Sequence, residues 1–291
     1  MDRFKLHSGL LSAEISLSGG ELRSLQYGET QLIWQGDPAY WDGSAPFLFP
    51  FCGRVKDGFY RWQDLQYPMT IHGFLPTAQM SVAEHTDDRL TLTLTDSPET
   101  RSVYPFPFAL TMDYQLCADG LEIAASVTAG DIALPFSFGC HPGFNLPVGD
   151  NGFDNAALHF DSDAPLTRIE ITENGLLGDG RSVYPLTNST LPLSPDPAGG
   201  CGIFFAVAKP QRALTLTAPS LPCDIRVDFA DFPVLGLWHA EGAPYLCIEP
   251  WQGLPAPDGV STDLANKPET VTLAPHETKT LTMQIRLLQK G

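Results

Sequence analysis

Hydrophobic and polar residues alternate with a period of two along most of this chain, which is the pattern of half-buried β-strands. Residues 89–95 show it most clearly, with leucines at every second position and threonines between them. Residues 109–129 predict a β-hairpin, because two alternating runs flank the turn pair Asp119-Gly120. Residues 271–285 show the same alternation on both sides of a turn that contains a proline. The chain therefore predicts many short antiparallel strands.

Glycine and proline divide the chain into short segments, with 26 residues of each type. Both suit turns and disfavour long helices. We find no long amphipathic stretch with helical spacing, and no repeat of fixed period that would indicate a propeller. The pattern predicts an all-β fold, a large antiparallel sandwich that forms one domain over residues 1–291. The segment 144–200 is rich in Asn, Asp, Pro and Gly, and we expect long connections there across one face.

The net charge narrows the range of partners. Seventeen Lys and Arg residues stand against 34 Asp and Glu residues, which gives a formal charge of −17. Such a surface repels nucleic acids and anionic lipids, so we expect no nucleic-acid partner and no membrane partner. No stretch predicts a membrane span, and the first residues lack the apolar run of a signal peptide. We expect a cytoplasmic protein, either a monomer or a homodimer.

Familiar cofactor and nucleophile motifs are missing from the sequence. There is no phosphate-binding loop, dinucleotide fingerprint, nucleophile elbow or H-E-x-x-H zinc motif. None of the six cysteines is spaced C-x-x-C, which favours reduced thiols. We therefore expect no cofactor.

Two of the seven histidines stand among glycine, proline and aromatic residues, in "TIHGFLP" and "FGCHPGFNLP". Glycine beside a ring lets a ligand approach the backbone, so His72 and His141 are candidate site residues. As metal ligands they would need further ligands at short spacing, which the sequence does not offer, and we expect no metal. A nucleophile made of Cys140 and His141 is also disfavoured, because neighbours on a strand point to opposite faces.

A carboxylate follows an apolar run in "APYLCIEPWQGLP". Glu249 has two interpretations. It could reach solvent or an arginine at the end of a strand, as charged groups usually do. Alternatively, it is a general base whose pKa is raised towards the working range by burial.

Arg54 follows an aromatic run in "PFLFPFCGRVKDGFYRW". Its guanidinium suits hydroxyl or carboxylate oxygens, and nearby aromatic rings can stack on sugar faces. The simpler interpretation is a solvated arginine in a turn.

The ordered segments "FPFCGRVKDGFYRW…YPMTIHGFLP", "FSFGCHPGFNLP" and "YLCIEPWQGLP" resemble the aldose 1-epimerase (galactose mutarotase-like) family, in particular its LacX-like branch. The resemblance covers nearly the whole chain. It implies a β-supersandwich with a sugar site in a cleft on one sheet. It also implies an isomerase of carbohydrate metabolism that interconverts the α and β anomers of an aldose.

The resemblance further implies a role for each candidate residue. His141 would donate a proton to the ring oxygen, and Glu249 would remove the proton of the anomeric hydroxyl. Arg54 and His72 would hold sugar oxygens, and we expect Trp251 to contribute an aromatic face to substrate binding. One acid and one base suffice for ring opening and reclosure, without metal or cofactor.

One family feature has no match in the sequence. Related mutarotases use an aspartate from a later strand, whereas "AGGCGIFFAVAKP" has no acid at its centre and Asp196 lies just before it. Galactose is therefore not assured as the substrate.

Three alternatives stay open at this point. A hexose-6-phosphate mutarotase would need a phosphate clamp, which Lys56 and Arg61 near Arg54 could supply. A non-catalytic carbohydrate-binding or sensing protein could use aromatic residues such as Trp41, Trp62 and Trp251 on the same fold. A glycoside hydrolase would need two carboxylates across a bond, and only one stands in an apolar setting.

Overall fold

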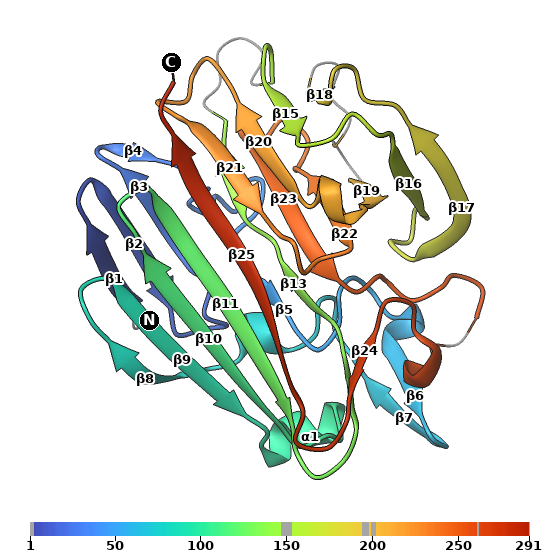
Figure 1. Cartoon of the computed structure of the whole chain (residues 1–291). Coiled ribbons are helices and arrows are strands. Elements are labelled where there is room, and N and C mark those ends of the chain that lie inside the picture. The colour runs from blue at the N-terminus through green and yellow to red at the C-terminus, as the bar shows by residue number, and fades with distance from the viewer. Residues whose placement is uncertain (1–2, 147–152, 194–197, 199–201, 261, 291) are drawn as a thin grey trace.

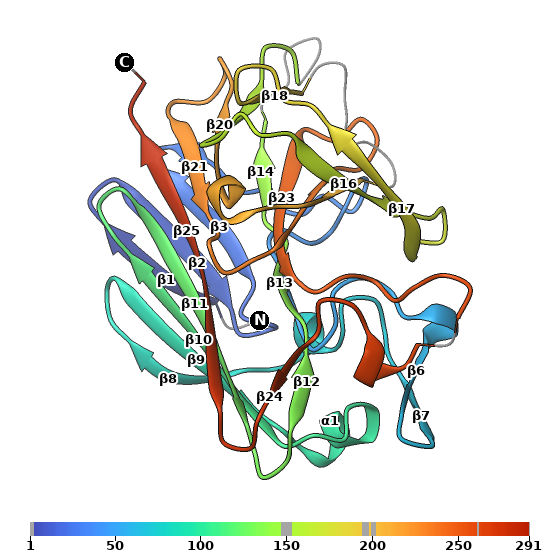
Figure 2. The same ribbon diagram turned by 45° about the vertical axis from the view of Figure 1, so that its right-hand side comes forward.

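The computed structural model describes residues 3–146, 153–193, 198, 202–260 and 262–290. Its described strands form two large antiparallel sheets that pack against each other, which confirms the all-β sandwich (Figures 1 and 2). One sheet has nine strands, in the order β18 (Thr190–Pro192), β15 (Ala157–Phe160), β20 (Ala213–Thr217), β21 (Asp224–Asp228), β25 (Thr278–Leu288), β11 (Gly120–Ala129), β10 (Phe108–Leu116), β9 (Arg89–Thr95) and β8 (Ser81–His85).

The second large sheet has eight strands. Its order is β17 (Leu177–Tyr184), β16 (Leu166–Ile171), β19 (Ile203–Ala206), β22 (Val234–Trp238), β23 (Tyr245–Gln252), β13 (Phe138–Cys140) and β5 (Phe47–Leu48), with β14 (Gly143–Asn145) also paired to β23. Three smaller sheets flank the two layers. They contain β1 (Arg3–Ser8), β2 (Leu11–Ser16), β3 (Leu22–Tyr27) and β4 (Thr30–Gln31); β6 (Phe59–Trp62) and β7 (Leu65–Pro68); and β12 (Leu134–Phe136) and β24 (Val271–Leu273).

The predicted hairpin forms as the alternation requires. Strands β10 and β11 pair in antiparallel register with Leu116 opposite Leu121, which confirms the turn at Asp119-Gly120. Every second residue of both strands is buried in the core. The predicted strands at 89–95 and in the C-terminal segment also form, as β9, β24 and β25.

The segment 144–200 was expected to consist of long connections, and that prediction is wrong in part. It contains β15, β16, β17 and β18, and both β17 and β18 lie at edges of the large sheets. Strand β17 is exposed over most of its length, so its sequence carries little of the alternation that marks a half-buried strand. A short helix, α1 (Pro98–Val103), was also not predicted. The hydroxyl of Ser97 caps it by accepting a hydrogen bond from the N–H of Thr100.

Alternate residues of strand β23 point to the two opposite faces of the eight-stranded sheet. Its residues Leu246 and Ile248 belong to the large hydrophobic cluster between the two sheets. Cys247, Glu249 and Trp251 alternate with them and therefore point to the opposite face. That second face is where a cavity lies.

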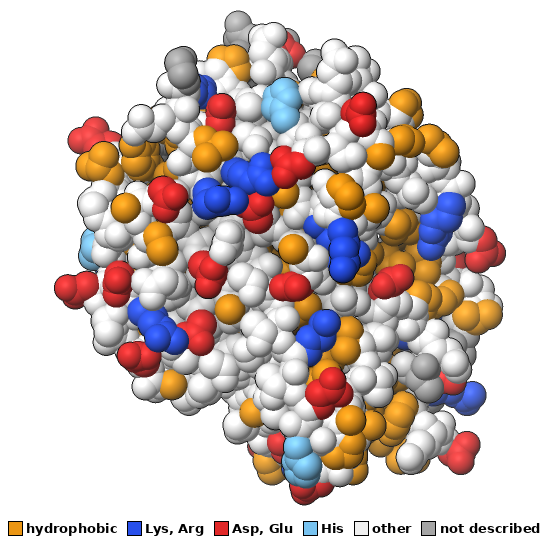
Figure 3. Space-filling view, viewed as in Figure 1, with side chains coloured by type: hydrophobic (Ala, Val, Ile, Leu, Met, Phe, Trp, Pro, Cys, Tyr) orange, Lys and Arg blue, Asp and Glu red, His pale blue; other side chains and the backbone are white. Residues whose placement is uncertain are grey.

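The exposed face of the nine-stranded sheet carries charge pairs and threonines. Arg226 contacts Asp161 at 2.6 Å and Asp228 at 2.9 Å, and Arg286 contacts Asp228 at 2.6 Å. Figure 3 shows positive and negative side chains interspersed over this face. Such exposed pairs contribute little individually, and we assign them no chemistry.

Two further expectations can be compared with the structure. The described cysteines are free thiols, as expected, and Cys201 lies outside the described residues. Among the described residues, no helix has both the length and the hydropathy that a membrane crossing requires.

Candidate active site

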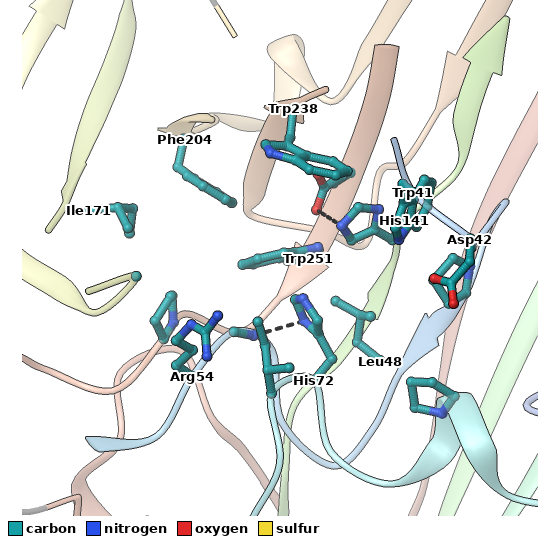
Figure 4. Close-up of a pocket in the computed structure, with 18 of the residues that line it drawn as sticks. Trp41, Asp42, Leu48, Arg54, His72, His141, Ile171, Phe204, Trp238 and Trp251 are labelled. Atoms are coloured by element: carbon teal, nitrogen blue, oxygen red, sulfur yellow. Dashed lines mark hydrogen bonds and ion pairs between the residues drawn. The ribbon is translucent and has the colours of Figure 1, made fainter. Parts of the chain in front are cut away.

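Glu249 lies on β23, and His141 faces it from the two-residue connection between β13 and β14, which both pair with β23. The register pairs Gly139 with Trp251 and Gly143 with Cys247, which puts His141 opposite Glu249. Side chains at facing positions have Cβ atoms about 4.5–5.5 Å apart. The Nε2 atom of His141 consequently lies 3.2 Å from the Oε2 atom of Glu249 (Figure 4).

Both members of this pair are buried at the wall of the cavity. The side chain of Glu249 is 1% exposed and that of His141 is 10% exposed. Apart from their mutual contact, the carboxylate oxygens of Glu249 and the Nδ1 atom of His141 have no hydrogen-bond partner. Burial raises the pKa of Glu249 well above its usual value of 4.5, because the charged form is desolvated. Burial lowers the pKa of His141 to about 4 for the same reason.

His72 approaches the pair from the segment that follows β7. The backbone N–H of Gly53 donates a hydrogen bond of 3.2 Å to its Nδ1 atom, so the proton of the neutral ring is on Nε2. Burial lowers the pKa of His72 well below 6.5, with further contributions from His141 and Arg54. The rings of His72 and His141 are 5.6 Å apart between centroids. His72 is therefore a neutral hydrogen-bond donor beside His141 and Glu249.

The glycine after His72 does not open space for a ligand, contrary to the sequence-based expectation. Gly73 has a φ of +78°, and a Cβ atom at this position would lie 2.1 Å from the carbonyl oxygen of Phe49. The backbone of Phe49 fills the space that a side chain would need. Gly73 is thus required for chain packing, and that packing positions His72.

Arg54 is an exposed side chain on the same cavity wall. It lies against the turn between β16 and β17, where a Cβ atom on Gly175 would be 3.1 Å from both Cδ and Nε of Arg54. Gly175 also has a φ of +73°, which glycine adopts without strain. The turn therefore supports the guanidinium, and Figure 4 shows Arg54 below Trp251 and beside His72.

Aromatic rings form much of the remaining wall. Trp251 is 2% exposed and packs on Phe204 at 4.9 Å between centroids. Its indole Nε1–H is buried without a hydrogen-bond partner. On the opposite side, Trp41 lies 5.1 Å from the ring of His141, and Trp238 lies 5.8 Å from it. The pair is thus enclosed by apolar surface that can accept a sugar face.

The cavity has a volume of about 930 Å³. The five residues singled out from the sequence, Arg54, His72, His141, Glu249 and Trp251, all line it. They come from segments far apart in the chain. The structure therefore brings the whole predicted set together on one face of the eight-stranded sheet.

Sequence reasoning missed some of the wall and misplaced one residue. Trp238 and Phe204 line the cavity, and both stand at positions that alternate with core residues of β22 and β19, so strand alternation could have indicated them. Trp62 was a candidate for sugar stacking, but it packs on Phe106 at 5.0 Å and is not part of the cavity wall. Asp196, considered as a replacement for the family aspartate, lies outside the described residues. The strand expected to carry that acid contributes Phe204 instead.

A third side chain that could bind a metal ion, Cys247, lies beside His141 and Glu249. Ligand atoms of His141, Cys247 and Glu249 are all within 4.8 Å of one another, and this is the one such group in the described part of the chain. Sequence reasoning missed it, although the alternation of Cys247 with the core residues Leu246 and Ile248 could have indicated it. Burial raises the pKa of the Cys247 thiol well above its usual value. The thiol is therefore protonated in the free protein.

A family model described as aldose 1-epimerase matches residues 2–286. This chain belongs to the aldose 1-epimerase family. The resemblance inferred from the ordered motifs is therefore confirmed.

Individual relatives agree with the family assignment. Chromosomal protein LacX from Lactococcus lactis subsp. lactis is 28% identical over 297 residues, covering 98% of this chain and 99% of LacX. A galactose mutarotase related enzyme from Lactobacillus acidophilus has a structure similar to this one, with a TM-score of 0.92 at 29% identity over 98% of this chain and 97% of the other. A galactose mutarotase-like protein from Lactobacillus casei gives the same TM-score and identity over 98% and 100% of the two chains. The fold is thus galactose mutarotase-like, and the family supports a sugar epimerase.

Proposed function

We propose that this protein is a mutarotase that interconverts the α and β anomers of a neutral aldose. Glu249 takes the proton of the anomeric hydroxyl, and His141 gives a proton to the ring oxygen. The bond between C1 and the ring oxygen then breaks, which leaves an open-chain aldehyde. Rotation about the C1–C2 bond and reclosure, with both proton transfers reversed, give the other anomer.

The observation that carries this proposal is the 3.2 Å separation of the His141 and Glu249 side chains. The two oxygens that exchange protons are bonded to the same carbon, so the acid and the base must lie close together. In glycoside hydrolases the two carboxyl groups are about 5–9.5 Å apart, since they act across a bond to a leaving group. The short contact therefore favours an acid–base pair acting on one hemiacetal carbon.

The pair needs only one proton between its two members. Burial favours the neutral form of each, so the free protein holds the proton on Glu249. Ring opening needs the proton on His141, and the direct contact provides the route for that transfer. Ring opening leaves the neutral pair, because Glu249 has gained a proton and His141 has lost one. In reclosure Glu249 returns its proton to the anomeric oxygen and His141 takes the proton from the former ring oxygen. Transfer of that proton from His141 back to Glu249 across the direct contact restores the neutral pair. The catalyst therefore returns to its starting state without an external proton source.

The remaining predicted residues have supporting roles in this proposal. The Nε2–H of His72 donates a hydrogen bond to a sugar oxygen, and Arg54 beside it donates to another. Trp251 supplies an apolar face and an unpaired indole N–H. Each positioned proton transfer contributes about 10²–10⁴-fold to the rate, and these side chains set the position.

The charges along the cavity favour a neutral sugar over a sugar phosphate. Lys56 and Arg61, considered as a phosphate clamp, are not part of its wall. Arg23 does line it, but contacts Glu21 at 2.9 Å and is already paired. Among the described wall residues, this leaves Arg54 as the cation without an acidic partner. A phosphate dianion is usually held by several charge-assisted contacts.

The test is anomer exchange measured by NMR on a set of common aldoses and their 6-phosphates, with the buffer rate subtracted. We expect acceleration on at least one free aldose and a lower kcat/KM on its 6-phosphate. A higher kcat/KM on the phosphate would contradict the neutral-sugar assignment. Calorimetry on the same sugars identifies the non-catalytic alternative, which predicts binding with no rate enhancement.

A further inference from the structure

Lys267 is a buried lysine behind the cavity wall, and the mechanism above does not use it. The residue is 5% exposed. Its Nζ atom donates hydrogen bonds to the carbonyl oxygen of Leu254 and, at 3.4 Å, to the hydroxyl of Ser137. The ammonium also lies 5.4 Å from the centre of the Phe51 ring, in a cation–π arrangement. Burial lowers its pKa to about 8, which leaves it mainly charged at neutral pH.

The three contacts of Lys267 belong to three segments that supply site residues. Phe51 precedes Gly53 and Arg54. Ser137 joins β12 to β13, whose end leads to His141. Leu254 follows β23, the strand of Glu249 and Trp251. One side chain therefore connects all three segments at the point where they enter the site.

Backbone hydrogen bonds carry this connection to the cavity. The N–H of Ala256 donates to the carbonyl of Arg54 at 2.9 Å. The N–H of Gly53 donates to His72, and the N–H of His72 donates to the carbonyl of Gly53 at 3.0 Å. The segment that Lys267 holds at Leu254 is thus bonded to the segment that carries Arg54 and orients His72.

A lysine in this position costs stability. No Asp or Glu pairs with it among the described residues, and its charge is compensated by a carbonyl, a hydroxyl and a ring face. A well-packed apolar side chain of similar volume is often equal or better for stability than a buried charge. The connection of three site segments gives this charge a function that an apolar side chain lacks.

We propose that Lys267 is a positioning residue that holds the sugar-binding wall of Arg54 and His72 in place. This inference rests on the proposed function, because its main effect is on sugar binding. Lys267 touches no reacting atom, so its loss should raise KM and leave kcat nearly unchanged.

The experiment compares K267M, K267R and S137A with the wild-type protein. We expect K267M to raise KM about tenfold, with kcat within about threefold of the wild-type value. That result indicates weaker sugar binding with the chemical step intact. K267R retains a donor for the Leu254 carbonyl, so its KM should be close to that of the wild-type protein. S137A removes one contact and should show a smaller rise. K290M is the matched control, because Lys290 also donates to two carbonyls, of Ala218 and Leu221, away from the cavity.

Hydrogen–deuterium exchange provides a second measurement that does not depend on activity. In K267M, peptides that contain Gly53 and Ala256 should exchange at least about tenfold faster than in wild type, and they should be unchanged in K290M. A variant that is merely unstable would lose active protein, which lowers apparent kcat and leaves KM unchanged.

Several results would overturn the proposal. Faster exchange with an unchanged KM would make Lys267 purely structural. An unchanged exchange rate would show that Lys267 does not hold these segments together. If wild type accelerates no anomer exchange, the proposed function fails, and the sugar dissociation constants of wild type and K267M then decide the positioning role: equal constants overturn it, and weaker binding by K267M supports it.

Discussion

His141, between β13 and β14, lies opposite Glu249 on β23, and the two side chains meet at 3.2 Å. The sheet register fixes this contact, so no loop movement is needed to form it. Sites built on strands hold their geometry more tightly than sites built on loops. The proposed acid and base are therefore already in contact in the free protein.

The pH dependence of kcat/KM follows from the single proton that the pair shares in the free protein. Activity should fall on the acid side when both groups are protonated, and on the alkaline side when both are deprotonated. Burial lowers the pKa of His141 to about 4, so the acid limb should lie well below 6.5. Burial raises the pKa of Glu249, so the alkaline limb should lie well above 4.5. An acid limb with its midpoint at 6.5 or higher, measured by NMR exchange, would contradict this assignment.

The E249Q variant should be more stable than wild type at alkaline pH. Because the folded pKa of Glu249 is raised, the folded protein binds more protons than the unfolded chain between pH 4.5 and that pKa. Its stability therefore falls as pH rises through this window, and glutamine removes the loss. We expect a gain of about 1–3 kcal/mol in the free energy of unfolding above the window. Urea denaturation at acid and alkaline pH measures it.

A matched control for that prediction is E173Q. Glu173 also lines the cavity but is exposed. Its replacement should leave the pH dependence of unfolding as in wild type. Equal behaviour of E249Q and E173Q would show that burial of Glu249 carries no cost in stability.

The G175A variant should bind sugar more weakly. The added methyl group would lie 3.1 Å from the side chain of Arg54 and displace the guanidinium from the wall. We expect KM to rise about three- to tenfold with little change in kcat. G242A is the control, since Gly242 has nearly the same φ, +72°, with nothing within 4 Å of a new Cβ atom. Both variants carry similar backbone strain, so an equal rise in KM would exclude a specific effect on Arg54.

The sequence predicted the strands well where one face of a strand is buried. Leucine alternation placed β9, β10 and β11, because periodicity reports a half-buried strand directly. Strand β17 could not be predicted in this way, since its residues are exposed on both faces. Burial alone did not decide the outcome, because β15 alternates between buried and half-buried residues and was still missed within the segment 144–200.

The candidate site could be predicted only as separate residues. Each carried a local signal, such as the carboxylate of Glu249 after an apolar run or the ring of His141 between Cys140 and a proline. Their meeting depends on pairing between strands that are distant in sequence, which no local pattern encodes. Cys140 lies in the core whereas His141 lines the cavity, in agreement with the alternation of neighbours on a strand. No local sequence pattern indicated a role for Lys267, because the residues that surround it come from three segments remote in the sequence.

The most direct test of the central claim is anomer exchange by wild type, H141Q, E249Q and the double variant on the aldose with the highest activity. Each single variant should lower kcat by about 10²–10⁴-fold. The double variant should be little slower than the slower single variant, because the two residues act as a unit. Wild-type rates in either single variant, or losses that multiply in the double variant, would contradict a shared proton between His141 and Glu249.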